Sequence, residues 1–215
     1  QDLWRSEILK LPVGPLAFIR DRYKSPDRLR QALRMFSSRQ PERISPYVGL
    51  TNIGANETPL QWWSEKYSAF EEWVKRLGEL ISNHIDDVIH TVENSELKNV
   101  NKKVQWLQTI KAWSEEAYDA GALDRIKLDK FFDSCISQEA KKGKQAPKHM
   151  FFVALEEHFE QRPTHIEASF VQALNLQVKT RLQQRKVSEQ ILGFDDLITQ
   201  VNQAVISPDL SHDLA

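Results

Sequence analysis

The stretch YSAFEEWVKRLGELISNHIDDV, residues 67–88, decides the fold of this chain. One set of positions in it recurs with alternating spacings of three and four residues. The set is Tyr67, Phe70, Val74, Leu77, Ile81, His84 and Val88. This heptad spacing is typical of a helix that packs along its length against another helix. We therefore predict one long helix over residues 62–93, roughly 45 Å in length.

The partner of this helix is expected further along the chain. One apolar stripe lies at Val104 and Leu107, and a second one follows about twenty residues later. The second stripe consists of Leu128, Phe131, Phe132 and Cys135. Both are expected to fold back as antiparallel helices. The predicted fold class is all-α: an irregular helical subdomain with a long antiparallel helical hairpin, an arm over roughly residues 60–140.

Other segments also have helical signals, and none has the alternation of a β-strand. A short helix is predicted from Pro15 to about Tyr23. Ser25 is a suitable N-cap for the next helix, because Pro26 then occupies its first position. Residues 150–159 predict a short apolar helix, and residues 164–190 predict a long one. The segment 40–60 lacks helical period and is expected to be a connector.

Charge is distributed unevenly along the chain, although the formal net charge is only −1. Residues 1–43 are basic, residues 57–96 are acidic, and residues 97–150 are basic again. Blocks of this kind are usually solvated helix faces, but they also occur where one surface meets phosphate and another does not. A single cysteine, Cys135, rules out an internal disulfide and favours a reducing compartment.

The sequence contains none of the common catalytic motifs. It has no GxxxxGK[ST] phosphate loop, no GxGxxG, no HExxH and no CxxC. Two adjacent carboxylate pairs occur, Asp86-Asp87 and Asp195-Asp196, but neighbouring helical residues point about 100° apart and do not converge on one metal ion. His84 is interpreted as a residue at the edge of the core. Trp73, Trp106 and Trp113 lie on amphipathic helices and are interpreted as packing residues.

Four stretches, in this order, resemble one family of motor proteins. They are LWRSEILKLP (3–12), VQWLQTIKAWSEE (104–116), LDKFFDSCISQEAKKGKQAPKHMFFVALEE (128–157) and LGFDDLITQVNQAV (192–205). The last, with Gly193, Phe194, Asp195, Asp196 and Leu197, resembles the segment before the Walker B motif in UvrD/Rep-like superfamily 1 helicases. Together the four are most similar to RecB-like subunits, the beta subunits of exodeoxyribonuclease V.

This resemblance implies a helical accessory subdomain of the 1B type over residues 1–190. Residues 191–215 would begin the return into a motor domain, and we expect the chain to be a segment of a longer protein. The parent enzyme would be a cytoplasmic ATP-dependent helicase and exonuclease that uses ATP and Mg²⁺, cofactors for which this segment has no site. It would act on double-stranded DNA ends in repair and recombination, with RecC-like and RecD-like partner subunits.

In that context two lysine clusters are expected to contact duplex phosphates. They are Lys98, Lys102 and Lys103, and then Lys141, Lys142, Lys144 and Lys148. The next candidate is the face formed by Arg28, Arg30 and Arg34. Without the family context, the lysine-rich segment 141–148 would be interpreted as a loop that is exposed to solvent and binds nothing. Likewise, Asp195 and Asp196 are most simply helix N-terminal residues favoured by the macrodipole.

Two alternatives stay open from the sequence. One is a helical scaffold that binds only protein, through the acidic helix of residues 62–93. The other is the 1B subdomain of a different UvrD-like helicase, such as an AddA type. A Walker A lysine upstream in the reading frame would separate both helicase readings from the scaffold.

The absence of a phosphate loop generates the first prediction. The purified 215-residue chain should show no ATPase and no nuclease activity, because nothing in its sequence can position a nucleotide and Mg²⁺ for phosphoryl transfer. The measurement is ATP turnover with and without DNA. DNA-stimulated turnover above a no-protein control would contradict the prediction.

Overall fold

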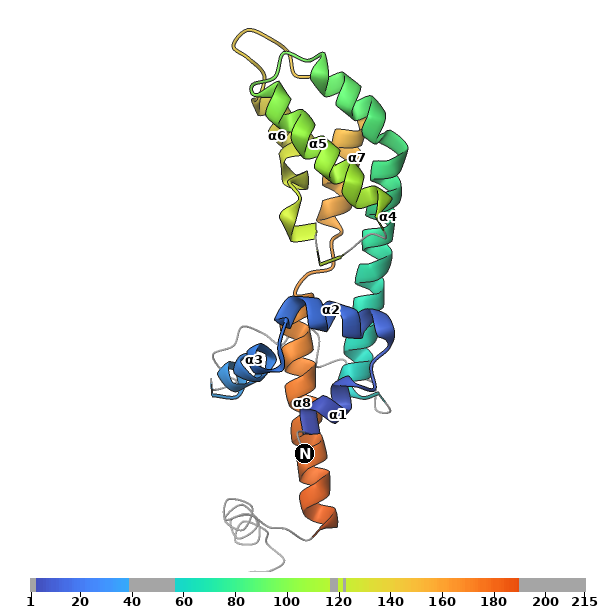
Figure 1. Ribbon diagram of the computed structural model, residues 1–215, viewed down its shortest axis with the longest axis vertical. Helices are drawn as coiled ribbons and strands as arrows, with labels where there is room; N and C mark the ends of the chain where they lie inside the picture. Colours follow the sequence, from blue (N-terminus) through green and yellow to red (C-terminus); the bar gives the residue numbers. More distant parts are fainter. Residues whose placement is uncertain (1–2, 39–56, 117–119, 122, 190–215) are drawn as a thin grey trace, which may run out of the picture.

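The structure is a computed structural model that describes residues 3–38, 57–116, 120–121 and 123–189. Across these residues the fold is all-α, as predicted, and the only β-type pairing is an isolated bridge between Leu97 and Ala140. The molecule is elongated, and its longest helix runs up one side (Figure 1). No helix in the described ranges is both long and apolar enough to cross a membrane.

The long helix is α4, Pro59–Glu93, and it confirms the prediction for residues 62–93. Its start is fixed by a capping box: Thr58 Oγ1 accepts from Gln61 N at 3.3 Å, and Gln61 Oε1 accepts from Thr58 N at 2.9 Å. Pro59 occupies a first-turn position that needs no N–H partner. The helix continues through Gly78, which is buried, so this glycine causes no break.

The predicted heptad positions of α4, which we call its seam, are buried except at one position. Tyr67, Phe70, Val74, Leu77, Ile81 and Val88 all belong to the core. His84 is only half-buried, and the neighbouring Ile85 takes its place in the core at 3% exposure. The reason is geometric: a helix with 3.6 residues per turn drifts against a strict seven-residue repeat, so the buried stripe moves by one position after several turns.

Helix α5, Val100–Glu115, is the predicted antiparallel partner of α4. It runs back alongside the upper part of α4 (Figure 1) and buries Leu107, Ile110 and Trp113. Its Lys111 Nζ lies 2.6 Å from Asp86 Oδ1 of α4. This ion pair is exposed, so the packing of apolar side chains supplies most of the stability of the hairpin.

The second predicted partner does not form one helix. Residues 128–135 divide into a short 3-10 helix, η4 (Leu128–Phe131), and helix α6 (Asp133–Gln138). Phe132 between them has an extended backbone, with ψ of 144°, so the chain turns there and cannot continue along α4. Leu128 and Phe131 still reach the core, which explains why their spacing resembled a helical stripe.

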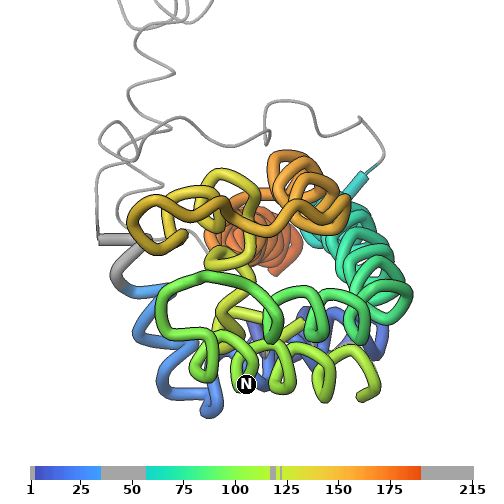
Figure 2. Tube along the Cα trace, turned by 90° about the horizontal axis from the view of Figure 1, so that it is seen from above, coloured from blue at the N-terminus to red at the C-terminus, as the bar shows by residue number. Residues whose placement is uncertain are grey.

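Helix α7 (Met150–Glu160) packs on the middle of α4. Trp73 Nε1 donates to His158 O at 2.9 Å, and His158 Nε2 lies 3.0 Å from Trp73 O. The two rings also stack, with centroids 4.9 Å apart. Viewed along the long axis, α4, α5 and α7 enclose the core of the upper half, which we call the arm (Figure 2).

The lower half, which we call the base, combines the start of the chain with its last described helix. It contains α1 (Leu3–Ile8), α2 (Val13–Tyr23), α3 (Pro26–Ser38) and α8 (Ile166–Ser188) around the lower part of α4. Helix α3 begins at Pro26, as predicted. Two buried hydrogen bonds fix α8: Trp63 Nε1 donates to Ile166 O at 2.9 Å, and Gln177 Nε2 donates to Glu7 Oε2 at 3.0 Å.

The seam generates a prediction about stability. Leu77 is completely buried in the middle of α4. Leu77→Ala should lower the free energy of unfolding by about 2–5 kcal/mol, because it removes apolar contacts and leaves a cavity. Chemical denaturation of the full chain measures this, with Leu182→Ala on α8 as control, since Leu182 is 45% exposed. Equal effects of the two substitutions would mean that the seam is not the core.

Candidate nucleic-acid interface

Two lysine clusters that are far apart in the sequence meet at the upper end of the arm. The α4–α5 turn pairs with the end of α6: Lys98 N donates to Glu139 O at 2.9 Å, and Lys141 N donates to Glu96 O at 2.9 Å. These bonds flank the bridge between Leu97, which is fully buried, and Ala140. Both segments lie together at the top of the molecule (Figure 1). We call this end the basic tip.

Residues 141–148 form the outer loop of the basic tip. Lys144 N donates to Lys141 O at 2.9 Å and closes a turn, in which Gly143 has a φ of 77°. A residue other than glycine would be strained in this left-handed conformation. Lys141 and Lys144 each lie 3.5 Å from a carboxylate oxygen of Glu96. Lys142 and Lys148 are also exposed.

Glu96 is the acidic group at the centre of this loop. The ammonium of Lys144, and then the hydrogen bond from Lys141, hold the pKa of Glu96 below its ordinary value of 4.5. Glu96 is therefore ionised at neutral pH. All three side chains are about half exposed, so solvent and salt screen these contacts strongly. The two lysines can exchange Glu96 for a phosphate at little cost.

The α5 side of the basic tip contributes two exposed lysines. Lys98 lies in the α4–α5 turn, and Lys102 lies in the first turn of α5. Lys102 Nζ is 5.2 Å from the centre of the Trp106 ring, a cation–π distance. Trp106 is half-buried, so it supports the lysine from the protein side and leaves the ammonium accessible.

Lys103 differs from its neighbours, although the sequence groups it with them. It is 4% exposed, and its Nζ donates to Lys98 O at 2.8 Å and to Glu139 Oε2 at 3.0 Å. A buried ammonium with two partners holds the fold together and cannot reach a phosphate outside. We therefore remove Lys103 from the proposed interface. Sequence spacing did not separate these roles, because Glu139 is distant in the chain.

The remaining set is strongly cationic. It comprises Lys98, Lys102, Lys141, Lys142, Lys144 and Lys148, from two segments of the chain. Glu96 faces this set, while Glu139 is neutralised by Lys103. Such a surface can attract a polyanion, but it has no group arranged for catalysis. No group of three or more metal-ligating side chains that could hold an ion occurs among the described residues.

Other residues singled out in the sequence have structural contacts. Asp86 binds Lys111, while the neighbouring Asp87 Oδ2 lies 2.9 Å from His149 Nε2 of the α7 N-cap, so the two carboxylates diverge as predicted. Trp73 and Trp113 are buried packing residues. On α3, Arg30 pairs with Asp27 at 3.6 Å, and Arg28 and Arg34 are exposed. Gly193–Leu197 lie outside the described residues.

Comparison with known proteins gives a relative of this chain. The chain is similar to the RecBCD enzyme subunit RecB of Escherichia coli (strain K12), with 22% identity over 208 residues. The similar region covers 96% of this chain and 17% of RecB, so the chain spans about a sixth of its relative. No family model matches the chain. The chain is therefore related to one region of RecB.

The Lys103–Glu139 pair generates a prediction about pH. The hydrogen bond from Lys103 holds the pKa of Glu139 below 4.5 in the folded chain, so ionised Glu139 stabilises the fold above that pH. Glu139→Gln should lower the free energy of unfolding at pH 7 by up to about 1 kcal/mol, since the carboxylate is partly screened. The difference from wild type should shrink as the pH falls below 4.5.

Denaturation at several pH values measures this difference. Glu157→Gln is the matched control, because Glu157 is an exposed carboxylate on the neighbouring α7. A Glu139→Gln difference that stayed constant down to acidic pH would show that the charge of Glu139 does not stabilise the fold.

Proposed function

We propose that this chain is a DNA-binding accessory subdomain of a RecB-like helicase–nuclease subunit. The observation that carries the proposal is the pairing of residues 96–98 with residues 139–141, which unites two lysine clusters at the end of the arm. The similarity to RecB over nearly the whole chain supports the same reading. In this view residues 1–190 form the 1B-type subdomain, and residues 191–215 lead into a motor domain.

The ligand of the basic tip is the phosphate backbone of duplex DNA. Lysine suits contacts that must move along DNA, because a flexible point charge follows phosphates without reading bases. The lysines project from a loop and a helix start at the end of an elongated body, so they can reach a broad, convex rod such as a duplex. Binding should therefore be independent of sequence and steeply dependent on salt.

The base is the proposed contact with protein. Large apolar side chains are exposed there: Leu9, Val13, Leu182 and Val187. Exposed apolar side chains can contribute to a protein interface. We propose that this part contacts the motor domain of the same protein or a RecC-like subunit. ATP, Mg²⁺ and the nuclease reaction would belong to other domains, and a RecD-like subunit would complete the complex.

A scaffold that binds only protein is the second candidate, and the same exposed apolar residues favour it. The two candidates differ at the basic tip, which a scaffold does not need. If the parent protein were an AddA-type helicase, the proposed DNA-binding function would be the same and only the partner subunits would differ.

Charge reversal at the basic tip tests the proposal. Lys141→Glu, Lys142→Glu and Lys144→Glu together, in the complete helicase complex, should weaken binding to duplex ends evenly across sequences. Each lost phosphate contact should reduce the salt slope of log K by about 0.9. The measurement is duplex affinity over a salt series.

A control variant replaces two exposed lysines away from the tip, Lys75→Glu and Lys179→Glu, and should leave the slope unchanged. Equal affinity of the tip variant and wild type throughout the salt series would reject the basic tip as the contact. The face of Arg28, Arg30 and Arg34 would then be the next candidate.

A further inference from the structure

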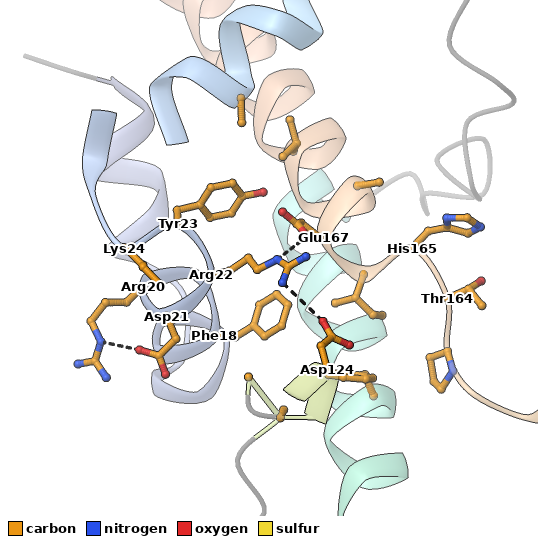
Figure 3. Close-up of a pocket in the computed structure, with 18 of the residues that line it drawn as sticks. Phe18, Arg20, Asp21, Arg22, Tyr23, Lys24, Asp124, Thr164, His165 and Glu167 are labelled. Carbon is orange, nitrogen blue, oxygen red and sulfur yellow. Dashed lines mark hydrogen bonds and ion pairs between the residues drawn. The ribbon is translucent and has the colours of Figure 1, made fainter. Parts of the chain in front are cut away.

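A second cationic feature lies where the arm meets the base. A cavity of about 1430 Å³ opens between α2, α3, the short helix η3 (Leu123–Arg125) and the start of α8 (Figure 3). Six basic side chains line it, against three carboxylates. The basic residues are Arg20, Arg22, Lys24, Arg28, Arg125 and Arg162.

Three of these arginines already have carboxylate partners. Arg22 lies 2.6 Å from Glu167 and 3.5 Å from Asp124, as Figure 3 shows. Arg162 also contacts Asp124, at 3.4 Å, and Arg20 contacts Asp21, at 3.3 Å. These pairs use all three carboxylates of the lining.

The other three cations of the lining are Lys24, Arg28 and Arg125. Within the described part of the chain, they form no ion pair. They come from the end of α2, the start of α3 and η3, so they surround the cavity from three segments. A ligand in the cavity would therefore meet uncompensated positive charge.

The start of α8 adds further positive potential. Its N-cap, His165, makes no side-chain cap hydrogen bond, and Ile166, Glu167 and Ala168 of the first turn line the cavity. The first N–H groups of a helix have no partner within the helix and carry the positive end of its dipole. Glu167 offsets part of this charge but is bound by Arg22.

Tyr23 has a buried hydroxyl next to the cavity. Its side chain lines the cavity and is only 8% exposed, and no described group accepts a hydrogen bond from its hydroxyl. Burial raises the pKa of Tyr23 well above its ordinary value, so the hydroxyl keeps its proton and stays a donor. A buried donor without an acceptor is unfavourable in a finished fold.

The remaining lining is apolar and partly aromatic. Phe18 borders the cavity and is half-buried, and Phe70 and Val171 also line it. Proteins bind single-stranded nucleic acid by combining positive charge along the backbone with aromatic rings on which bases stack. A duplex keeps its bases inside and offers only its convex outer surface, so a cavity of this kind suits a single strand.

We propose that this cavity binds a segment of single-stranded nucleic acid, with Lys24, Arg28 and Arg125 at its phosphates and Phe18 beside a base. The proposal rests on the proposed function in one respect, that the partner is nucleic acid. The cavity lies among α2, α3 and the start of α8 in the lower part of the molecule, whereas the basic tip is at its upper end (Figure 1). A duplex at the tip and a single strand in the cavity can thus be held together near a fork.

The test compares a cavity variant with a charge-matched control in the full 215-residue chain. The cavity variant is Lys24→Asn with Arg125→Gln; asparagine is chosen because Lys24 has a φ of 56°, which asparagine tolerates. The control, Lys75→Gln with Lys179→Gln, removes the same charge from exposed helix positions. Equal thermal unfolding of the three proteins establishes that each is folded.

Binding is measured by fluorescence anisotropy with labelled oligothymidylate and, separately, with a blunt duplex. For single strands each phosphate contact contributes about 0.7 to the salt slope, which corresponds to about fivefold in affinity at 0.1 M salt. The cavity variant should therefore bind oligothymidylate roughly 25-fold more weakly than the control and bind the duplex as well as the control does.

The outcomes separate this inference from the proposed function. Oligothymidylate affinity that is equal in the cavity variant and the control, or absent in the wild-type chain, overturns the inference and leaves the tip untouched. Duplex affinity that survives charge reversal at the tip rejects the basic tip as the duplex contact, whatever the single strand does. Inorganic pyrophosphate, which should compete with oligothymidylate only in proteins with an intact cavity, identifies phosphate as the group that is bound.

Discussion

The burial of one apolar stripe on α4 is the constraint on which the rest of the structure depends. The stripe extends from Leu60 to Val92, so both halves of the molecule are built on the same helix. In the arm it is covered by α5 and α7, and in the base it is covered by α8. In proteins most helical stability comes from tertiary packing of the apolar face. The arm and the base share α4, and each covers a different part of its apolar stripe.

The polar contacts have a different effect: they fix the positions at which the segments packed on α4 end. Trp63 and Trp73 project from α4 and pack large rings against α8 and α7, and they also donate to backbone oxygens at both ends of the segment between α7 and α8. Lys103 does the same at the tip, where its ammonium binds the α4–α5 turn and Glu139. Each of these three side chains is a buried donor with a defined acceptor. The hydrogen bonds favour one register of the packed segments over other registers that would bury a similar apolar area.

These contacts place positive charge at two separate heights along the molecule. At the basic tip the lysines are exposed and weakly paired, which suits a ligand that slides. In the cavity the arginines are largely fixed by Asp124 and Glu167, and the uncompensated cations border a recess with aromatic floor. Under the two proposals made above, the tip would contact the outside of a duplex and the recess would bind a single strand, so the two features would act together in an accessory part of a RecB-like protein.

The sequence by itself determined the helical class and the existence of the long helix α4, which was predicted over residues 62–93 and spans Pro59–Glu93, because these features depend on residues close together in the chain. Heptad spacing is a local pattern. Only the tertiary structure decided which lysines are available. Lys102 and Lys103 are neighbours, yet one is exposed beside Trp106 and the other is buried with Glu139. The tertiary structure also placed residues 98–102 and 141–148 at the same end of the molecule. It turned the chain at Phe132 within residues 128–135, and it placed Tyr23 beside a cavity. Each of these features depends on contacts between segments that are far apart in the chain. The free energy of such contacts cannot be derived from a local sequence pattern.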